Sequence, residues 1–289
     1  MRKSCGSVLC DLTCLLLLYT TALHGQAGRC PFNTNSLQFV GSGVEQAKCL
    51  LRPVQPFGRI GNQLAELPPQ LGSLVGKNVT ISKLALRRFL RAHGIEESQI
   101  GGSLDEPLSR ANNGSARSPV ATYFVIHDTS TPNFLNDPFP ANINSPDWPF
   151  NNFAKYQPVA HIFINRVGAS TTKVNFRTPF RATKFELQVL RIRGKGLFLH
   201  TELIQPRRTD PSGGSQNDAL APTPGFTEKQ LDRLALVYVA ASLRHGQWLI
   251  PAYHAVLDTG LSNAHDDPQA FDLSLWSARL KLLLESIGQ

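Results

Sequence analysis

The chain has 289 residues, of which 42% are hydrophobic and 17% are charged, and this composition excludes a disordered or fibrous protein. Its length allows one large domain or two small ones. The net charge is +8, but the basic residues are scattered and no nucleic-acid-binding motif is present. We therefore expect no nucleic-acid partner, and the charge favours an acidic polymer or surface.

The N-terminus has the pattern of an export signal. Arg2 and Lys3 precede an apolar segment that is densest over residues 14–19, and small residues ending at Ala27 form a cleavage site. The segment is interrupted by an aspartate and is too short for a comfortable membrane span. We predict a signal peptide over residues 1–27, a periplasmic or secreted protein, and no stable membrane span once the leader is removed. A lipid-modified cysteine is the alternative, but no cysteine has the expected small residues before it.

Cleavage at that site leaves two cysteines, Cys30 and Cys49. Neither has the spacing of a metal ligand with a second cysteine, and two cysteines in an exported chain predict one disulfide. Both belong to a small, mostly helical N-terminal region that we place at residues 28–115.

The clearest element of this region is a helix over residues 80–94. Apolar residues recur there at helical spacing, Thr80 is a candidate N-cap and Gly94 a candidate stop. Residues 103–119 contain an Asn-Asn-Gly-Ser run and are expected to form a linker.

Three segments of the second region have the composition of buried strands: residues 120–127, 159–166 and 196–204. The first two are separated by a long Pro- and Asn-rich segment that carries Phe134, Phe139, Trp148, Phe150 and Phe153. Long irregular segments tend to be functional, so these aromatics could line a groove, although local packing is the simpler expectation.

Two helices are expected nearer the C-terminus. Thr227 and Gln230 form a capping box for a helix that runs to about Arg244, and Asp272 can cap a second helix with a leucine-rich stripe. Strands interspersed with helices predict an α/β fold over residues 116–289, with a mixed central β-sheet flanked by helices.

The candidate chemistry lies in His127, which ends the first strand, and in a distant loop segment that offers His254, His265 and Asp267. Two histidines and one aspartate match a catalytic zinc site, which leaves its fourth position to water. Any one of these histidines is more often a hydrogen-bonded structural residue, so the prediction depends on the combination. Glu202 lies in an apolar strand, where burial would raise its pKa toward that of a general base.

In these segments the chain resembles the zinc-dependent N-acetylmuramoyl-L-alanine amidases, which share their fold with peptidoglycan-recognition proteins. The resemblance runs from about residue 119 to the C-terminus. In the family the corresponding segments are a strand that ends in a ligand histidine, a hairpin, the strand of the catalytic glutamate, the segment of a second histidine ligand, and an Asp-Pro segment with the third ligand. Here they are residues 124–130, 161–168, 199–203, 253–258 and 265–272.

The resemblance implies that His127, His254 and Asp267 bind one Zn²⁺. It implies that Glu202 is the general base and that His265 stands where the family has an oxyanion-stabilising lysine. His265 is also the alternative to Asp267 as third ligand. The chain departs from the family at residues 179–184, where the histidine of a Trp-His-Ala-Gly motif is missing.

The implied reaction is hydrolysis of the amide bond between N-acetylmuramic acid and L-alanine in peptidoglycan or muropeptides, by a monomeric enzyme. Arg181, Arg207 and Arg208 could bind stem-peptide carboxylates, although a solvated surface is an equal explanation for them. A non-catalytic peptidoglycan-binding module on the same fold is the alternative function. A third class is an exported structural or inhibitory protein whose histidines belong to the core.

Overall fold

The computed structural model describes residues 28–112, 115, 117–209 and 219–288, so the signal peptide predicted for residues 1–27 lies outside the described residues. Its centre is a five-stranded sheet in the order β5-β4-β6-β3-β9. Strands β4, β6, β3 and β9 are parallel, and β5 pairs antiparallel with β4. This confirms the predicted α/β fold with a mixed central sheet. The strands are β3 (Tyr123–Asp128), β4 (Ile162–Ile164), β5 (Ser170–Thr172), β6 (Phe198–Leu203) and β9 (Ile250–Tyr253).

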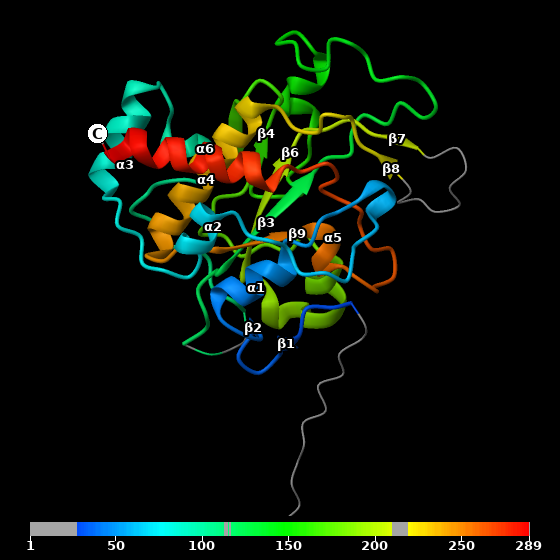
Figure 1. Ribbon diagram of the computed structural model, residues 1–289. Coiled ribbons are helices and arrows are strands. Elements are labelled where there is room, and N and C mark those ends of the chain that lie inside the picture. The colour runs from blue at the N-terminus through cyan, green and yellow to red at the C-terminus, as the bar shows by residue number, and fades with distance from the viewer. Residues whose placement is uncertain (1–27, 113–114, 116, 210–218, 289) are drawn as a thin grey trace, which may run out of the picture.

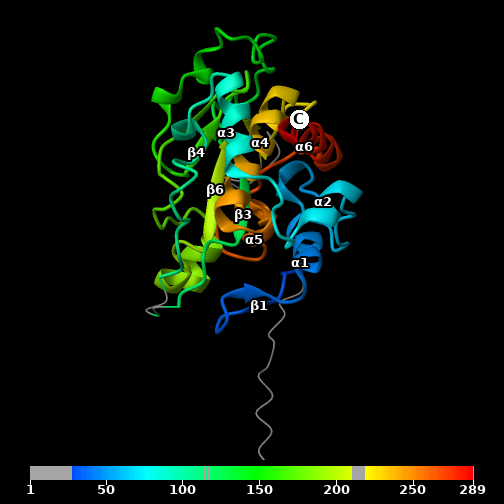
Figure 2. The ribbon, with the colours of Figure 1, turned by 90° about the vertical axis from the view of Figure 1, so that its left-hand side faces the viewer.

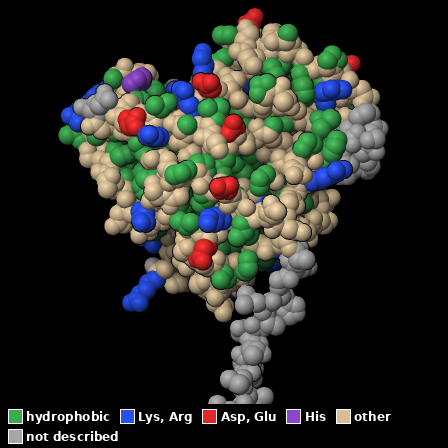
Figure 3. All heavy atoms as spheres, in the orientation of Figure 1, with side chains coloured by type: hydrophobic (Ala, Val, Ile, Leu, Met, Phe, Trp, Pro, Cys, Tyr) green, Lys and Arg blue, Asp and Glu red, His purple; other side chains and the backbone are tan. Residues whose placement is uncertain are grey.

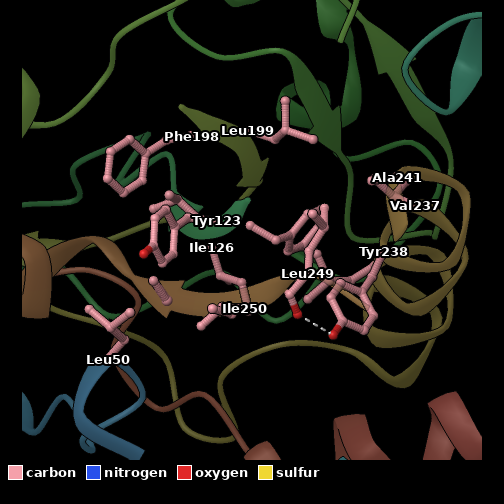
Figure 4. Packing of buried hydrophobic residues seen from close by; sticks show 14 of the residues in the cluster. Leu50, Tyr123, Ile126, Phe198, Leu199, Val237, Tyr238, Ala241, Leu249 and Ile250 are labelled. Atoms are coloured by element: carbon pink, nitrogen blue, oxygen red, sulfur yellow. Dashed lines mark hydrogen bonds between the residues drawn. The ribbon is translucent and has the colours of Figure 1, made fainter. Parts of the chain in front are cut away.

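The central strands are buried on both faces, which explains their β-branched and aromatic composition. Tyr123 pairs with Phe198 in the sheet register, and their rings stack 5.0 Å apart on the face that meets Leu50 (Figure 4). The opposite face meets Tyr238, whose hydroxyl donates a 2.6 Å hydrogen bond to the Leu249 carbonyl (Figure 4). Helices therefore cover the sheet on both sides.

The two C-terminal helices, α4 (Glu228–His245) and α6 (Leu273–Gly288), pack against each other (Figure 1). The predicted capping box of α4 is confirmed, because Thr227 and Gln230 satisfy each other's backbone N–H groups. Gly246 ends α4 in the left-handed conformation, with φ 88°, as glycine allows at little steric cost. Asp272 caps α6 by accepting from the Leu275 N–H at 2.8 Å.

The N-terminal region wraps around α6 and the β9 edge of the sheet (Figures 1 and 2). Its hydrophobic residues belong to the same core as those of the sheet. The Tyr123 hydroxyl donates to Gln46 at 2.9 Å, and a disulfide joins Cys30 to Cys49, as predicted. Its elements are β1 (Phe32–Asn33), β2 (Gln38–Phe39), α1 (Gly43–Leu50), α2 (Pro69–Leu74), α3 (Lys83–Ala92) and two 3₁₀ turns, Pro56–Gly58 and Glu97–Gln99.

Two predictions about this region were wrong. The N-cap of α3 is Ser82, which accepts from the Ala85 N–H at 3.1 Å, and not Thr80. Residues 103–119 are not a free linker, since Leu104 and Leu108 are buried in the core. The Asn-Asn-Gly-Ser run indicates a loop only near residues 112–115, whereas the apolar side chains at the start of the predicted linker pack into the core.

Several short elements connect the sheet to its surroundings. The segment between β3 and β4 contains two 3₁₀ turns, and Trp148, Phe150 and Phe153 belong to the hydrophobic cluster of Phe163, which confirms local packing for these three. Phe134 and Phe139 lie outside that cluster and contact each other, with ring centroids 6.2 Å apart. A π-helical turn, η5, and a 3₁₀ turn, η6, precede β6. These elements are Pro149–Asn151, Phe153–Lys155, η5 (Phe185–Leu190), η6 (Arg191–Gly194), the hairpin β7 (Arg208–Thr209) and β8 (Ala219–Leu220), and the short helix α5 (His254–Leu257).

Candidate metal centre

The candidate site lies at the carboxyl ends of the parallel strands β6, β3 and β9, which are neighbours in the sheet, and α/β sheets commonly bind ligands at this end. His127 is next to last in β3 and stands directly opposite Glu202 of β6 in the register, so both side chains point to the same face. His254 follows the last residue of β9 and begins α5. Asp267 is brought in by a backbone hydrogen bond from the Ala255 N–H to its carbonyl, at 2.8 Å.

His127, His254 and Asp267 converge on one point. The Nδ1 atoms of the two histidines lie 2.8 Å apart, and an Asp267 oxygen lies 3.1 Å from Nδ1 of His254. One donor atom from each residue fits within 4.8 Å of the others, and their side chains are almost fully buried, with relative exposures of 1, 2 and 3%. This group could hold a metal ion.

Two buried residues, His200 and Glu186, support the His127 ring on the side away from the other proposed ligands. Its Nε2 lies 3.0 Å from Nδ1 of His200, and Nε2 of His200 lies 3.1 Å from an oxygen of Glu186, slightly off the direction of the ring N–H. The same Glu186 oxygen accepts from the backbone N–H groups of Ala182 and Thr183, both at 3.1 Å. Ligand histidines in metal sites commonly have such a partner, which fixes the ring.

His254 has its own carboxylate partner. Its Nε2 lies 3.0 Å from Asp258, four residues further along the chain. The other Asp258 oxygen accepts from the Phe185 N–H at 2.9 Å. Phe185 and Glu186 are the first residues of η5, so this one turn supports both histidines.

These partners determine the tautomers. If the Glu186 carboxylate accepts the proton of Nε2 of His200, then Nδ1 of His200 carries no proton and is an acceptor. Nε2 of His127 is then the donor of the hydrogen bond between the two rings. His254 likewise carries its proton on Nε2, toward Asp258. Both Nδ1 lone pairs then face each other at 2.8 Å, which is repulsive unless a proton or a metal ion lies beside them. The donor set therefore fits a metal ion.

The pKa values of the histidines agree with this arrangement. Burial lowers the pKa of His127 well below its usual range, and the nearby His254 and His200 add to the effect. Burial also opposes protonation of His254, but Asp267 and Asp258 outweigh it and raise the pKa of His254 well above its usual range. Without a metal ion, a proton on His254 supplies the positive charge that the site requires.

The pKa values of the nearby carboxyl groups also indicate that a positive charge would stabilise the site. Burial raises the pKa of Glu202 and that of Asp128 well above their usual range, and the nearby Asp267 raises both further. Burial opposes ionisation of Asp267 as well, but His254 outweighs it and lowers the pKa of Asp267 well below its usual range. The negative charge of Asp267 thus opposes ionisation of both neighbouring carboxyl groups, and a cation bound by Asp267 would offset it.

Glu202 lies beside the proposed ligands. One of its oxygens is 4.0 Å from Nδ1 of His127, and the other has no hydrogen-bond partner within the described part of the chain. Its distance suits a role on a neighbouring water rather than as a fourth protein ligand.

His265 lies at the solvent side of the site. Its side chain is 47% exposed, its ring stacks on that of His254 with centroids 4.3 Å apart, and its Nδ1 is 3.6 Å from Asp267. The buried Asp267 is therefore the better placed of the two alternative third ligands. His265 is positioned to contact whatever enters from solvent.

The three arginines proposed for substrate carboxylates are not brought together. Arg181 precedes η5, while Arg207 and Arg208 lie at β7, at a different end of the molecule (Figure 1). Arg208 donates to the Asn136 carbonyl at 3.1 Å, and all three are half-buried. Their proposed role stays a prediction.

Sequence reasoning missed the three supporting residues His200, Glu186 and Asp258. Asp258 had a signal, because it stands four residues after His254. His200 shares a strand face with Glu202, but nothing in its sequence spacing indicated His127 as its partner. Glu186 lies just beyond the segment where the family motif is missing.

Comparisons of the chain with protein-family models, with curated proteins and with solved structures gave no match. Over the residues that the structure describes, no helix is long and apolar enough to cross a bilayer. The interpretation of the site therefore depends on its own residues and their geometry.

Proposed function

We propose that the chain is a zinc-dependent N-acetylmuramoyl-L-alanine amidase acting on peptidoglycan or its fragments. The observation that carries the proposal is the convergence of His127, His254 and Asp267 with Glu202 beside them. A pure binding module has no need of three buried ligands with a buried glutamate next to them. Two histidines and one carboxylate are a ligand set that suits zinc, which takes a fourth ligand from water or substrate.

Bound zinc would lower the pKa of a water molecule and polarise the scissile carbonyl. Glu202 can take the proton of the attacking water, since its raised pKa brings a buried carboxyl group into the range of a useful base. It can then deliver that proton to the amine of L-alanine as the amide bond breaks. His265, when protonated, can stabilise the oxyanion that develops on the carbonyl oxygen.

The proposed setting is outside the cytoplasm. The predicted leader exports the chain, and peptidoglycan is an exported polymer. The disulfide between Cys30 and Cys49 agrees with an oxidising compartment. We propose a periplasmic or secreted monomer.

The test combines metal analysis with mass spectrometry of digested peptidoglycan. The purified protein should hold about one zinc per chain, as catalytic zinc sites do. It should release stem peptides beginning with L-alanine and leave the glycan strands uncut. His127→Ala, His254→Ala and Asp267→Ala should each lose the metal, whereas His93→Ala, which changes an exposed histidine of the α3 C-cap, should keep it.

Two further variants separate chemistry from metal retention. Glu202→Gln should fold, hold zinc and lose activity by a factor of roughly 10²–10⁴, the usual contribution of a general base. His265→Ala should hold zinc and turn over more slowly. New reducing sugar ends would identify a glycosidase instead, and bound zinc without any peptide release would identify a binding module. A protein free of zinc that still folds would assign these histidines to the core.

A further inference from the structure

The η5 turn, which supports the two histidines, carries exposed aliphatic side chains on its solvent side. Leu187, Val189 and Ile192 are exposed by 46, 38 and 52%, although they lie within six residues of one another. Between and beside them, Arg191 and Arg193 are exposed as well. We call these five residues the η5 patch.

The charge of the segment is of one sign only. Lys184 and Lys195 flank the η5 patch, and the one acidic residue between them, Glu186, is fully buried. None of the four cations of the segment forms an ion pair with a described residue, and Arg193 donates only to the Thr34 carbonyl, at 3.1 Å. Elsewhere, basic and acidic side chains are interspersed over the face drawn in Figure 3.

The η5 patch is firmly based rather than a mobile loop tip. Phe185 packs its ring edge-on against Phe32 of β1 at 5.2 Å and stacks on Phe39 of β2 at 5.7 Å. The apolar side chains of the patch point outward because the inner positions of the turn are already filled. The η5 patch thus combines three partly exposed aliphatic side chains with cations that form no ion pair in the described part of the chain, and apolar clusters rimmed by polar residues mark interaction sites.

We propose that the η5 patch binds the surface of a bilayer that contains anionic lipid. Exposed aliphatic side chains gain by entering the boundary between headgroups and acyl chains, while arginine and lysine reach back to the phosphates. Anionic lipids attract such cations at short range. A single-stranded nucleic acid is commonly bound by aromatic side chains on which its bases stack, and the patch has none. A soluble polyanion, including the phosphate backbone of a duplex, would gain nothing from the three aliphatic residues.

The start of the described chain lies at the same end of the molecule. Arg29 donates to the Thr259 carbonyl at 2.5 Å, and Gln188 donates to the Ser262 carbonyl at 3.1 Å, so both hold the same loop. The described chain therefore begins close to the η5 patch. This inference does not depend on the proposed amidase activity.

The test is co-sedimentation with vesicles, using the chain expressed in full and purified after export. Vesicles of phosphatidylcholine mixed with phosphatidylglycerol should bind the protein, and vesicles of phosphatidylcholine alone should not. Binding should weaken when the salt is raised from about 0.1 to 1 M, which shortens the Debye length from about 10 to 3 Å.

Two variants of the η5 patch test its two components. The triple variant Leu187→Ser, Val189→Ser, Ile192→Ser and the double variant Arg191→Glu, Arg193→Glu should each reduce vesicle binding by at least about tenfold. The controls change exposed aliphatic residues and exposed arginines elsewhere on the molecule, and these variants should bind as the unchanged protein does. They are Leu64→Ser, Leu84→Ser, Leu282→Ser together, and Arg88→Glu, Arg91→Glu together.

Other outcomes overturn the proposal. Absence of binding to the phosphatidylglycerol vesicles excludes a lipid surface. Equal losses in the patch and control variants would mean that the overall positive charge binds without a defined site. If the serine variant keeps full vesicle binding while the glutamate variant loses binding to both vesicles and polyphosphate, the patch binds polyanions rather than a bilayer. Thermal melting of every variant shows whether the fold is kept, and zinc content and peptide release report separately on the proposed amidase.

Discussion

Two carboxylates outside the proposed ligand set orient the two histidines of the candidate metal centre. Glu186 reaches His127 only through His200, and Asp258 contacts His254 directly on the side away from the metal. Both lie on the same side of the site because η5 supports them. The ligand geometry thus depends on residues that a list of ligands would omit.

The first prediction concerns these supporting residues. Glu186→Gln and Asp258→Asn keep the size of the side chain but remove the negative charge that fixes each tautomer. Each should lower zinc affinity by about tenfold to a hundredfold, the usual effect of changing a partner of a ligand histidine. Competition with a chromogenic chelator measures this affinity.

The matched control for these two substitutions is Glu97→Gln. Glu97 is a partly buried carboxylate that pairs with Arg87 at 2.6 Å and lies in the N-terminal region. Glu97→Gln should leave zinc affinity unchanged. Unchanged affinity in Glu186→Gln and Asp258→Asn would show that main-chain packing alone orients the histidines.

At the scale of elements, helix caps contribute stability that can be assigned to single residues. Ser82 accepts from the first turn of α3, whereas Thr80, two residues earlier, makes no cap bond to this helix. Ser82→Ala should reduce the free energy of unfolding by about 1 kcal/mol, while Thr80→Ala should change it by much less. Urea unfolding of both variants followed by circular dichroism decides the point, and equal losses would contradict the assignment.

The sequence was most informative where a local pattern repeats. The strand that carries His127 near its end, the capping box at Thr227 and the cap at Asp272 each follow from neighbouring residues, and the structure has all three. The cap of α3 was misplaced because Thr80 and Ser82 both have side chains that can cap, and only the backbone conformation chooses between them. The ligand candidates were found because two histidines and one aspartate, at a strand end and on a loop, match the ligand set of a catalytic zinc site.

The supporting network could not be predicted from local patterns. His200 meets His127 across 73 residues of chain, and Phe185 meets Asp258 across another 73. Such contacts are set by strand register and by the path of η5, and neither leaves a periodic signal in the sequence. The burial of residues 104 and 108 in the common core was missed for the same reason. An apolar residue in the sequence does not show which distant segment it packs against.

For the whole molecule, pH should act in opposite directions with and without metal. The raised pKa of His254 contributes stability that is present below its unfolded value of about 6.5 and is lost as pH rises through the folded pKa. The raised pKa values of Glu202 and Asp128 have the same sign, because ionisation of these buried groups is favoured by unfolding. The lowered pKa values of His127 and His161 act in the opposite direction below about pH 6.5, because these histidines take up protons on unfolding. The metal-free protein should therefore lose stability as pH rises above about 7, where the histidines of the unfolded chain are already neutral.

The zinc-loaded protein should behave differently, because its ligands must be deprotonated before they bind. The difference in melting temperature between the loaded and metal-free protein should widen with rising pH. Differential scanning calorimetry at several pH values, with and without a chelator, measures it. A constant or narrowing difference would contradict the assignment of His254 as a ligand.

The disulfide makes a separate contribution. Cys30 and Cys49 close a loop with a sequence separation of 19 residues, for which loss of loop entropy in the unfolded chain predicts about 3 kcal/mol. Cys30→Ala with Cys49→Ala should lower the free energy of unfolding by that amount and leave zinc content unchanged. Urea unfolding of the oxidised protein and the double variant gives the comparison, and loss of zinc would show that this region also shapes the metal centre.

The parallel arrangement of the sheet has a consequence for how the protein acquires its metal. His127 and His254 are 127 residues apart in the chain, and they meet only after β3 has paired with β9. Pairings of such separation are slow to form, whereas helices and the short disulfide loop need only local contacts. Metal capture should therefore occur late in refolding, and its kinetics report when β9 has paired with β3.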